Sequence, residues 1–135
     1  SSEIAAIAGE IAASTYGGIT LAGPINDDPA NYTRFFILQN QASDNSSANR
    51  TSIIMTERDP DNVGSLHDAL GVFSNLNINL TKLDSHTLPG RTRRYAFYID
   101  FDENANSKRG KKAIRGIESL GWDVAVLGTY EKTEH

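Results

Sequence analysis

The sequence predicts an α+β fold, because segments with strand periodicity and segments with helix periodicity alternate over residues 51–135. Apolar and polar residues alternate between 94 and 102, as in a strand with one buried face. The stretches 65–75 and 108–120 instead carry apolar residues at helical spacing. With right-handed crossovers, the order β-α-β-β-α-β gives a four-stranded antiparallel sheet with two helices on one face, the ferredoxin-like arrangement. The other sheet face then needs a cover, which a second subunit often supplies.

Length and composition indicate an ordinary globular protein. The chain has 135 residues, enough for one or two small domains, and its 39% hydrophobic and 22% charged content is not that of a disordered chain. A net charge of −4 argues against general nucleic-acid binding. The absence of cysteine excludes disulfides and thiolate chemistry and agrees with a cytoplasmic setting. No apolar run approaches the roughly 20 residues that a membrane span needs, so we expect no membrane partner.

The first forty residues predict a helix followed by two strands. Small and aliphatic residues recur at helical spacing over 2–16, and Gly17 follows as a stop signal. A short strand is predicted over 19–25, then a turn rich in Asn, Asp and Pro. The next strand, 31–38, ends in a continuous apolar run and is predicted to be buried on both faces. Because the helix has so small a face and no strand before it, we expect the natural polypeptide to begin earlier.

A change of composition predicts a domain boundary near residue 40. Residues 39–50 contain no aromatic or large aliphatic side chain, which is typical of a linker. We therefore predict a first domain over 1–40, a linker over 41–50 and a second domain over 51–135.

The second domain carries its own start and stop signals. Its predicted strands are 51–57, 78–85, 94–102 and 123–130, and its predicted helices are 65–75 and 108–120. Gly64 closes the loop before the first helix, and Pro89-Gly90 marks the turn between the middle strands. Trp122 follows the glycine that ends the second helix, and we expect it to close the core there.

Two places combine residue types that suit a carboxylate-bearing ligand. The turn over 62–66 opens a helix, whose first amides can bind a carboxylate, and Gly64 lets the ligand approach closely. The alternative is that Gly64 only shapes the loop and Leu66 only packs. The second place is the strand entrance at Thr33 and Arg34, because Arg binds carboxylates through two parallel hydrogen bonds. Residue types alone favour the simpler interpretation there, a strand start with a solvated arginine.

Residues 51–135 resemble an ACT domain, a small amino-acid-sensing module. One motif is Val63-Gly64-Ser65-Leu66, where the family usually has Gly-Ala-Leu. The other is Asn79-Leu80-Thr81-Lys82-Leu83-Asp84-Ser85-His86, where relatives read like Asn-Leu-Thr-Lys-Ile-Glu-Ser-Arg-Pro. Ser65 replaces the common alanine, Asp84 replaces glutamate, and His86-Thr87 replaces Arg-Pro. The last departure bears on ligand specificity or on the strength of feedback.

The first forty residues distinguish between two families that carry this version of the module, prephenate dehydratases and aromatic amino acid hydroxylases. The run AAIAGEIAASTYG, the turn NDDPANY and then Thr33-Arg34-Phe35 look like the closing part of a prephenate dehydratase catalytic domain, an α/β domain. In a hydroxylase we expect the catalytic domain after the ACT module instead. The resemblance therefore covers nearly the whole chain and favours a prephenate dehydratase.

This resemblance implies a lyase that converts prephenate to phenylpyruvate, water and carbon dioxide in L-phenylalanine biosynthesis, with no cofactor. It implies that Thr33 is the catalytic hydroxyl and that Arg34 and Phe35 shape the site, since the reaction needs an oriented substrate and assistance to a leaving hydroxyl. The histidines have no metal-ligand spacing, so no metal is expected. We expect the 135-residue chain alone to lack activity, because most of the catalytic domain would lie outside it.

The resemblance further implies feedback by L-phenylalanine at an interface between ACT domains of a homodimer or homotetramer. The expected effector-binding residues are Asn62, Val63, Gly64, Ser65, Leu66, Leu80, Leu83, Asp84 and Ser85. Two alternatives stay open. One is a non-catalytic ACT module of another enzyme, such as an aromatic amino acid hydroxylase. The other is a chorismate mutase–prephenate dehydratase fusion, whose mutase domain would lie upstream.

Overall fold

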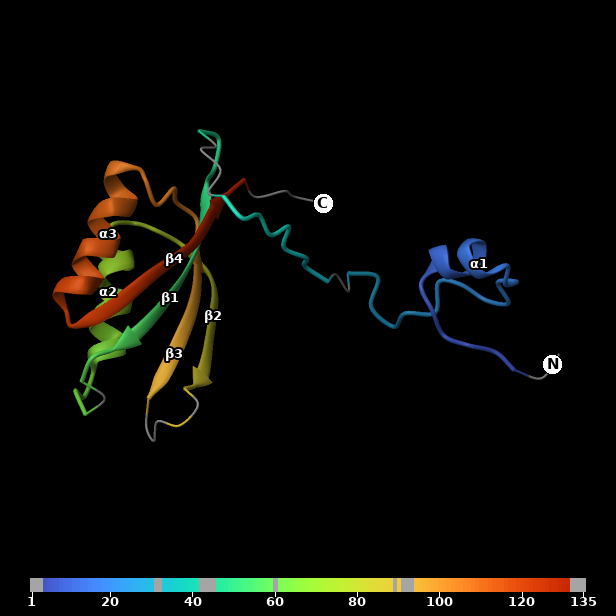
Figure 1. The fold of residues 1–135 in the computed structure, drawn as a ribbon, viewed down its shortest axis with the longest axis horizontal. Coiled ribbons are helices and arrows are strands. Elements are labelled where there is room, and N and C mark those ends of the chain that lie inside the picture. Colours follow the sequence, from blue (N-terminus) through green and yellow to red (C-terminus); the bar gives the residue numbers. More distant parts are fainter. Residues whose placement is uncertain are drawn as a thin grey trace. The chain divides into compact units, whose positions relative to one another are not determined.

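The computed structural model describes residues 4–30, 33–41, 46–59, 61–88, 90 and 94–131 (Figure 1). The chain divides into two compact units, Ser1–Leu38 and Gln39–His135. Within the described residues, no helix has both the length and the apolar character that a membrane crossing needs.

The second unit contains a four-stranded antiparallel sheet in the order β2-β3-β1-β4. Its elements are β1 (Arg50–Glu57), α2 (Ser65–Asn75), β2 (Leu80–Thr87), β3 (Tyr95–Phe101), α3 (Lys108–Ser119) and β4 (Trp122–Tyr130). They follow the predicted order, and the predicted antiparallel sheet is confirmed. Both helices lie on one face of the sheet, side by side (Figure 1). They approach closely at Gly116, where an added Cβ would lie 2.9 Å from Val72 Cγ1.

The core lies between the sheet and the two helices, where the amphipathic patterns placed it. Its buried residues are Ile53, Met55, Ala69, Phe73, Ile78, Ile99, Phe101, Ala113, Ile117 and Trp122. Leu66, Leu70 and Leu76 pack against it while partly exposed. The prediction that Trp122 closes the core is confirmed, since its side chain is 0% exposed.

Strand β2 begins two residues later than predicted. Asn77 adopts a left-handed conformation with φ 56°, and the Ile78 amide donates to the Phe73 carbonyl at 2.9 Å. Residues 77–79 therefore still belong to the turn that closes α2, and regular pairing with β3 starts only at Leu80.

The register of β3 separates the two faces of the sheet. Residues directly opposite each other on paired strands point to the same face. Leu83 pairs with Ile99 and Ser85 pairs with Phe97, so both β2 residues share the helix-covered face with the core. Asp84 lies between them and points to the other face.

In the first unit the structure corrects the predicted elements. Helix α1 spans only Glu10–Tyr16, so the predicted helix over 2–16 is wrong for the described residues 4–9. The predicted strands are also wrong, because residues 19–25 and the described residues 33–38 form no strand.

The physical reason is a lack of partners within the unit. A strand needs a neighbour for its backbone hydrogen bonds and apolar surface to cover its side chains. The apolar run predicted to be buried on both faces is exposed instead, with Phe35 84% and Leu38 90% exposed. A unit below about 40 residues seldom buries enough surface by itself.

Candidate ligand pocket

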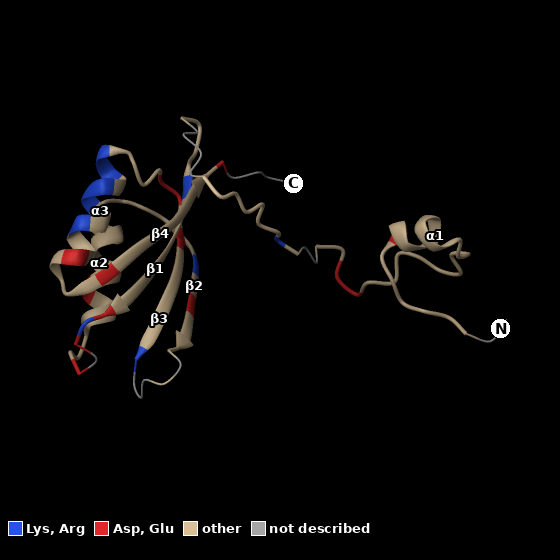
Figure 2. Cartoon of the chain, in the orientation of Figure 1, with Lys and Arg blue, Asp and Glu red and all other residues tan. Residues whose placement is uncertain are grey.

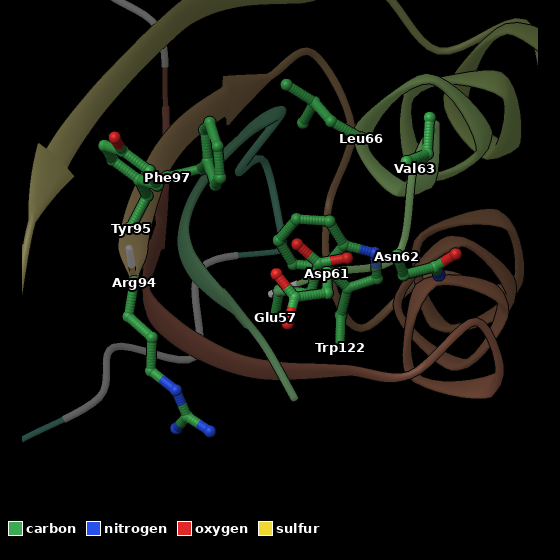
Figure 3. Close-up of a pocket in the computed structure, with 9 residues that line it drawn as sticks. All are labelled: Glu57, Asp61, Asn62, Val63, Leu66, Arg94, Tyr95, Phe97 and Trp122. Carbon is green, nitrogen blue, oxygen red and sulfur yellow. The ribbon is translucent and has the colours of Figure 1, made fainter. Parts of the chain in front are cut away.

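A pocket of about 370 Å³ opens at one end of the sheet in the second unit (Figure 3). It is lined by Glu57, Asp61, Asn62, Val63, Leu66, Arg94, Tyr95, Phe97 and Trp122. These residues meet because the strands are antiparallel. The last residues of β1 pair with the first residues of β3 and β4, as in Thr56 with Ala96 and Glu57 with Trp122. The loop from β1 into α2 completes the wall.

The loop wall is a succession of tight turns that ends at Gly64. The Asp61 amide donates to Asp59 Oδ1 at 3.2 Å, and the Ser65 amide donates to the Asn62 carbonyl at 3.3 Å. Gly64 has a φ of 87°, a left-handed conformation in which a side chain would be strained. As the N-cap of α2 it provides no side chain to the first-turn amides. The partly positive helix start is thus available to a negatively charged group from outside the helix.

The floor of the pocket is aromatic. The rings of Phe97 and Trp122 meet edge to face with centroids 5.7 Å apart. The centroid of the Tyr95 ring lies 6.4 Å from that of Phe97. Leu66 extends this apolar surface from α2. Such a floor suits an apolar or aromatic ligand group.

The polar groups of the pocket are mostly acidic. Glu57 and Asp61 contribute carboxylates, and Arg94 is the single cationic side chain among the lining residues. Its guanidinium donates to the carbonyl of Arg58 at 3.3 Å. Basic residues instead gather on α3, as Figure 2 shows. The pocket therefore favours a group of positive charge beside the aromatic floor.

Two buried side-chain atoms at the pocket have no hydrogen-bond partner among the described residues. They are Glu57 Oε1, an acceptor, and Trp122 Nε1, a donor. The two residues are directly opposite each other on β1 and β4. Buried polar atoms in folded proteins are nearly always paired, and an unpaired one costs about 1–3 kcal/mol.

The structure brings together only some of the residues predicted to bind an effector. Asn62, Val63 and Leu66 line the pocket, and Gly64 and Ser65 form the adjoining helix start.

The four residues predicted from β2 do not line the pocket. Ser85 lies at the same end of the sheet, since it pairs with the lining residue Phe97. Strand β3 nevertheless separates β2 from β1, so within one chain β2 does not adjoin the turn. Asp84 faces the opposite side of the sheet, and its hydrogen bond with Lys82, at 2.9 Å, lowers the pKa of its carboxyl.

The residues predicted to be catalytic lie in the first unit. Thr33, Arg34 and Phe35 are exposed and belong to no helix or strand. The Arg34 guanidinium lies over the Phe36 ring, 4.6 Å from its centroid. None of the three lines the pocket described above.

Sequence reasoning missed the pocket residues that come from strand ends. These are Glu57, Arg94, Tyr95, Phe97 and Trp122, together with Asp61 in the loop. One signal was available: Glu57 ends an apolar strand, and Trp122 follows a helix-ending glycine. Only the register of β1 with β4 shows that these two positions meet.

Comparison with known proteins finds similarity to the prephenate dehydratases. The family model described as prephenate dehydratase matches residues 1–43. Over 130 residues the chain is 38% identical to a bifunctional chorismate mutase/prephenate dehydratase of Pseudomonas aeruginosa, covering 95% of this chain and 34% of that protein. Over 131 residues it is 37% identical to a prephenate dehydratase of Lactococcus lactis subsp. cremoris, covering 93% of this chain and 46% of that protein. The chain is a relative of the prephenate dehydratases.

Solved prephenate dehydratases share the fold. The enzyme of Staphylococcus aureus superimposes with a TM-score of 0.62 at 28% identity, covering 69% of this chain and 34% of that chain. That of Arthrobacter aurescens, determined in complex with L-Phe, gives 0.58 at 23% identity, covering 70% of this chain and 30% of that chain. The resemblance to prephenate dehydratases inferred from the sequence is confirmed. The chain spans 34% and 46% of the length of the two curated relatives named above.

Proposed function

We propose that this chain is part of a prephenate dehydratase and carries that enzyme's ACT regulatory domain. The observation that carries the proposal is the similarity to two such enzymes along 93% and 95% of the chain. The match of residues 1–43 to the dehydratase family model supports the catalytic assignment of the N-terminal region. The parent enzyme would convert prephenate to phenylpyruvate in the cytoplasm, without a cofactor.

In this proposal residues 1–40 end the catalytic domain, 41–50 link the domains, and 51–135 form the ACT domain of ferredoxin-like topology. The sheet order β2-β3-β1-β4 with both helices on one face supports that topology. Thr33 would assist departure of the ring hydroxyl of prephenate, while Arg34 and Phe35 would hold the substrate. The ACT domains would join two or four chains.

The ACT domain would bind L-phenylalanine as a feedback effector. The pocket volume of about 370 Å³ lies in the usual range of small-molecule sites, roughly 300–1,000 Å³. The start of α2, which no side chain caps, suits the carboxylate, and the aromatic floor suits the ring. The Arthrobacter aurescens enzyme with the same fold binds L-Phe in its structure, which agrees with this effector.

Isothermal titration calorimetry of the 135-residue chain tests the effector. We expect L-phenylalanine to release or absorb measurable heat with the natural sequence. The variant Gly64→Val should show much weaker binding, because valine is strained at a φ of 87° and a branched side chain would crowd the helix start.

Circular dichroism of both proteins establishes that the variant is folded. If neither protein gives heat with L-phenylalanine, the sensing proposal is wrong. If the two proteins bind L-phenylalanine equally, the role of the helix start is wrong, but the binding of the effector stands.

The alternative, an ACT module of an aromatic amino acid hydroxylase, is not favoured, because residues 1–43 match the dehydratase family model. A mutase domain in the parent protein is a separate question. The reading frame upstream of Ser1 answers it directly.

A further inference from the structure

We propose that Glu57 and Trp122 bind the two charged ends of a free α-amino acid in the pocket, and so determine its selectivity for amino acids over acids or amines that have only one end. Glu57 Oε1 would accept from the α-ammonium group, and Trp122 Nε1–H would donate to the α-carboxylate. This inference rests on the proposed effector function and names side chains outside the two ACT motifs.

The two atoms are buried and have no hydrogen-bond partner among the described residues. Trp122 is 0% exposed, and its ring nitrogen is a buried donor that no described residue accepts. Glu57 Oε1 is a buried acceptor in the same condition. A ligand that supplies one donor and one acceptor would satisfy both atoms at once, which makes the pocket complementary to a zwitterion.

The spacing of the Glu57 and Trp122 side chains also suits an α-amino acid. Glu57 and Trp122 are opposite each other in the antiparallel β1–β4 pair. Such neighbours have Cβ atoms about 4.5–5.5 Å apart and side chains on one face. The ammonium and carboxylate of an α-amino acid are joined by one carbon atom, so adjacent partners are what they require.

The Trp122 ring is oriented so that its nitrogen lies toward the start of α2 (Figure 3). Figure 3 shows the Trp122 ring nitrogen on the side of Asn62, toward the loop that leads into α2. A carboxylate that accepts from this nitrogen would lie toward the positive start of α2. Two independent features, an indole N–H and a helix start without a side-chain cap, thus favour the carboxylate in one region.

The charge of the pocket lining favours a ligand that carries an ammonium group. Glu57 and Asp61 give the pocket lining one more negative than positive charge, counting Arg94. An anion without an ammonium group, such as a keto acid, would face this excess unpaired. Since both anchoring atoms are buried, the ligand must displace part of the wall.

The test measures binding of three compounds to the 135-residue chain by calorimetry. They are L-phenylalanine, 3-phenylpropionate, which lacks the ammonium group, and 2-phenylethylamine, which lacks the carboxylate. Glu57→Gln should weaken L-phenylalanine about tenfold or more, as expected for loss of a charged hydrogen bond, and should not weaken 3-phenylpropionate, which faces one negative charge fewer in the variant. Trp122→Phe should weaken L-phenylalanine more than 2-phenylethylamine, because both ligands lose the contact of their ring with the indole but only L-phenylalanine also loses the hydrogen bond to its carboxylate.

The matched control is Glu118→Gln, which removes the same charge from an exposed position on α3 outside the pocket. It should bind L-phenylalanine like the natural chain. Thermal unfolding gives a second readout: Trp122→Phe also leaves a cavity in the core and should lower the unfolding temperature, so binding by this variant is measured well below that temperature. Trp122 is also the sole tryptophan, so its fluorescence should change on binding.

The outcomes separate the two proposals. If Glu57→Gln and the natural chain bind L-phenylalanine equally, the Glu57 and Trp122 assignment is overturned while effector binding stands. If the natural chain binds none of the three compounds, the effector function itself is refuted, and this inference with it.

Discussion

Glu103 shows how one side chain can couple stability to pH. It lies in the loop before α3, its side chain is 13% exposed, and its carboxylate contacts the Arg109 guanidinium. The Asn104 amide also donates to it at 3.1 Å. Burial by itself raises the pKa of Glu103, but the hydrogen bonds from Arg109, Ser107 and Asn104 and the charge of Arg109 outweigh burial and lower the pKa.

We predict that Glu103→Gln destabilises the second unit at neutral pH and that the difference disappears in acid. The folded pKa is depressed, so the carboxylate contributes stability that is present above the unfolded value, about 4.3, and is lost as pH falls through the folded value. Urea unfolding of both proteins between pH 7 and pH 2 measures this. In an Arg109→Gln background the substitution should show less pH dependence, and an undiminished dependence would contradict the role of Arg109.

Helix α3 is the element whose beginning is specified most fully by local residues. Ser107 is its N-cap, and the hydroxyl accepts from the Gly110 amide at 2.9 Å. Gly110 itself is pressed against the preceding loop. A Cβ at this position would lie 2.1 Å from the Asn104 carbonyl oxygen. The start of α3 therefore requires a residue without a side chain on its third position.

We predict opposite effects for one substitution in the two helices. Gly110→Ala should destabilise the unit by about 1–3 kcal/mol, because the methyl group collides with backbone that must move. Gly71→Ala in α2 meets nothing within 4 Å and should stabilise the unit by about 0.5–1 kcal/mol. Chemical denaturation measures both. If both substitutions changed the free energy of unfolding equally, neither the collision at Gly110 nor the helix propensity of alanine would explain the result.

The elements of the second unit were predictable because each carries its own signal. Four strands and two helices lie within about two residues of their predicted bounds, since side-chain period and glycine stops are local properties. The late start of β2 depends on the left-handed Asn77 and could not be anticipated from strand propensity. The predicted strands 19–25 and 31–38 are absent from the described residues 19–25 and 33–38 for another reason: a strand forms only with a partner, and sequence propensity does not supply one.

The pocket was predictable only where a turn defines it. Gly64 and its neighbours could be assigned to a ligand from the chemistry of a helix start. Glu57 and Trp122 are 65 positions apart, and the β1–β4 register alone brings them opposite each other. That neither buried atom has a hydrogen-bond partner among the described residues is likewise a property of the packed structure.

At the scale of the whole molecule, the two units differ in how much of their apolar surface their own residues bury. The second unit encloses a core, whereas the first exposes most of its large apolar side chains. Thr33 and Phe35 are among the exposed residues. Catalysis of the proposed dehydration requires a substrate that is oriented and shielded by walls around these positions.

We predict that the purified 135-residue chain forms no detectable phenylpyruvate from prephenate. The reason is that Thr33, Arg34 and Phe35 are exposed within the first unit, which provides no walls to orient and shield the substrate around them. An absorbance assay for phenylpyruvate, with the full-length Lactococcus lactis relative measured in parallel, provides the check. Normal turnover by this chain would contradict the prediction.

The pocket at the end of the sheet joins residues from β1, β3 and β4, which are brought together only in the folded unit. A compound that binds there has no site on the unfolded chain. Its binding energy is therefore added to the free energy of unfolding of the entire unit, about 2.7 kcal/mol at a hundredfold excess over Kd. Occupancy by a metabolite would thus also govern how often this domain opens to proteases.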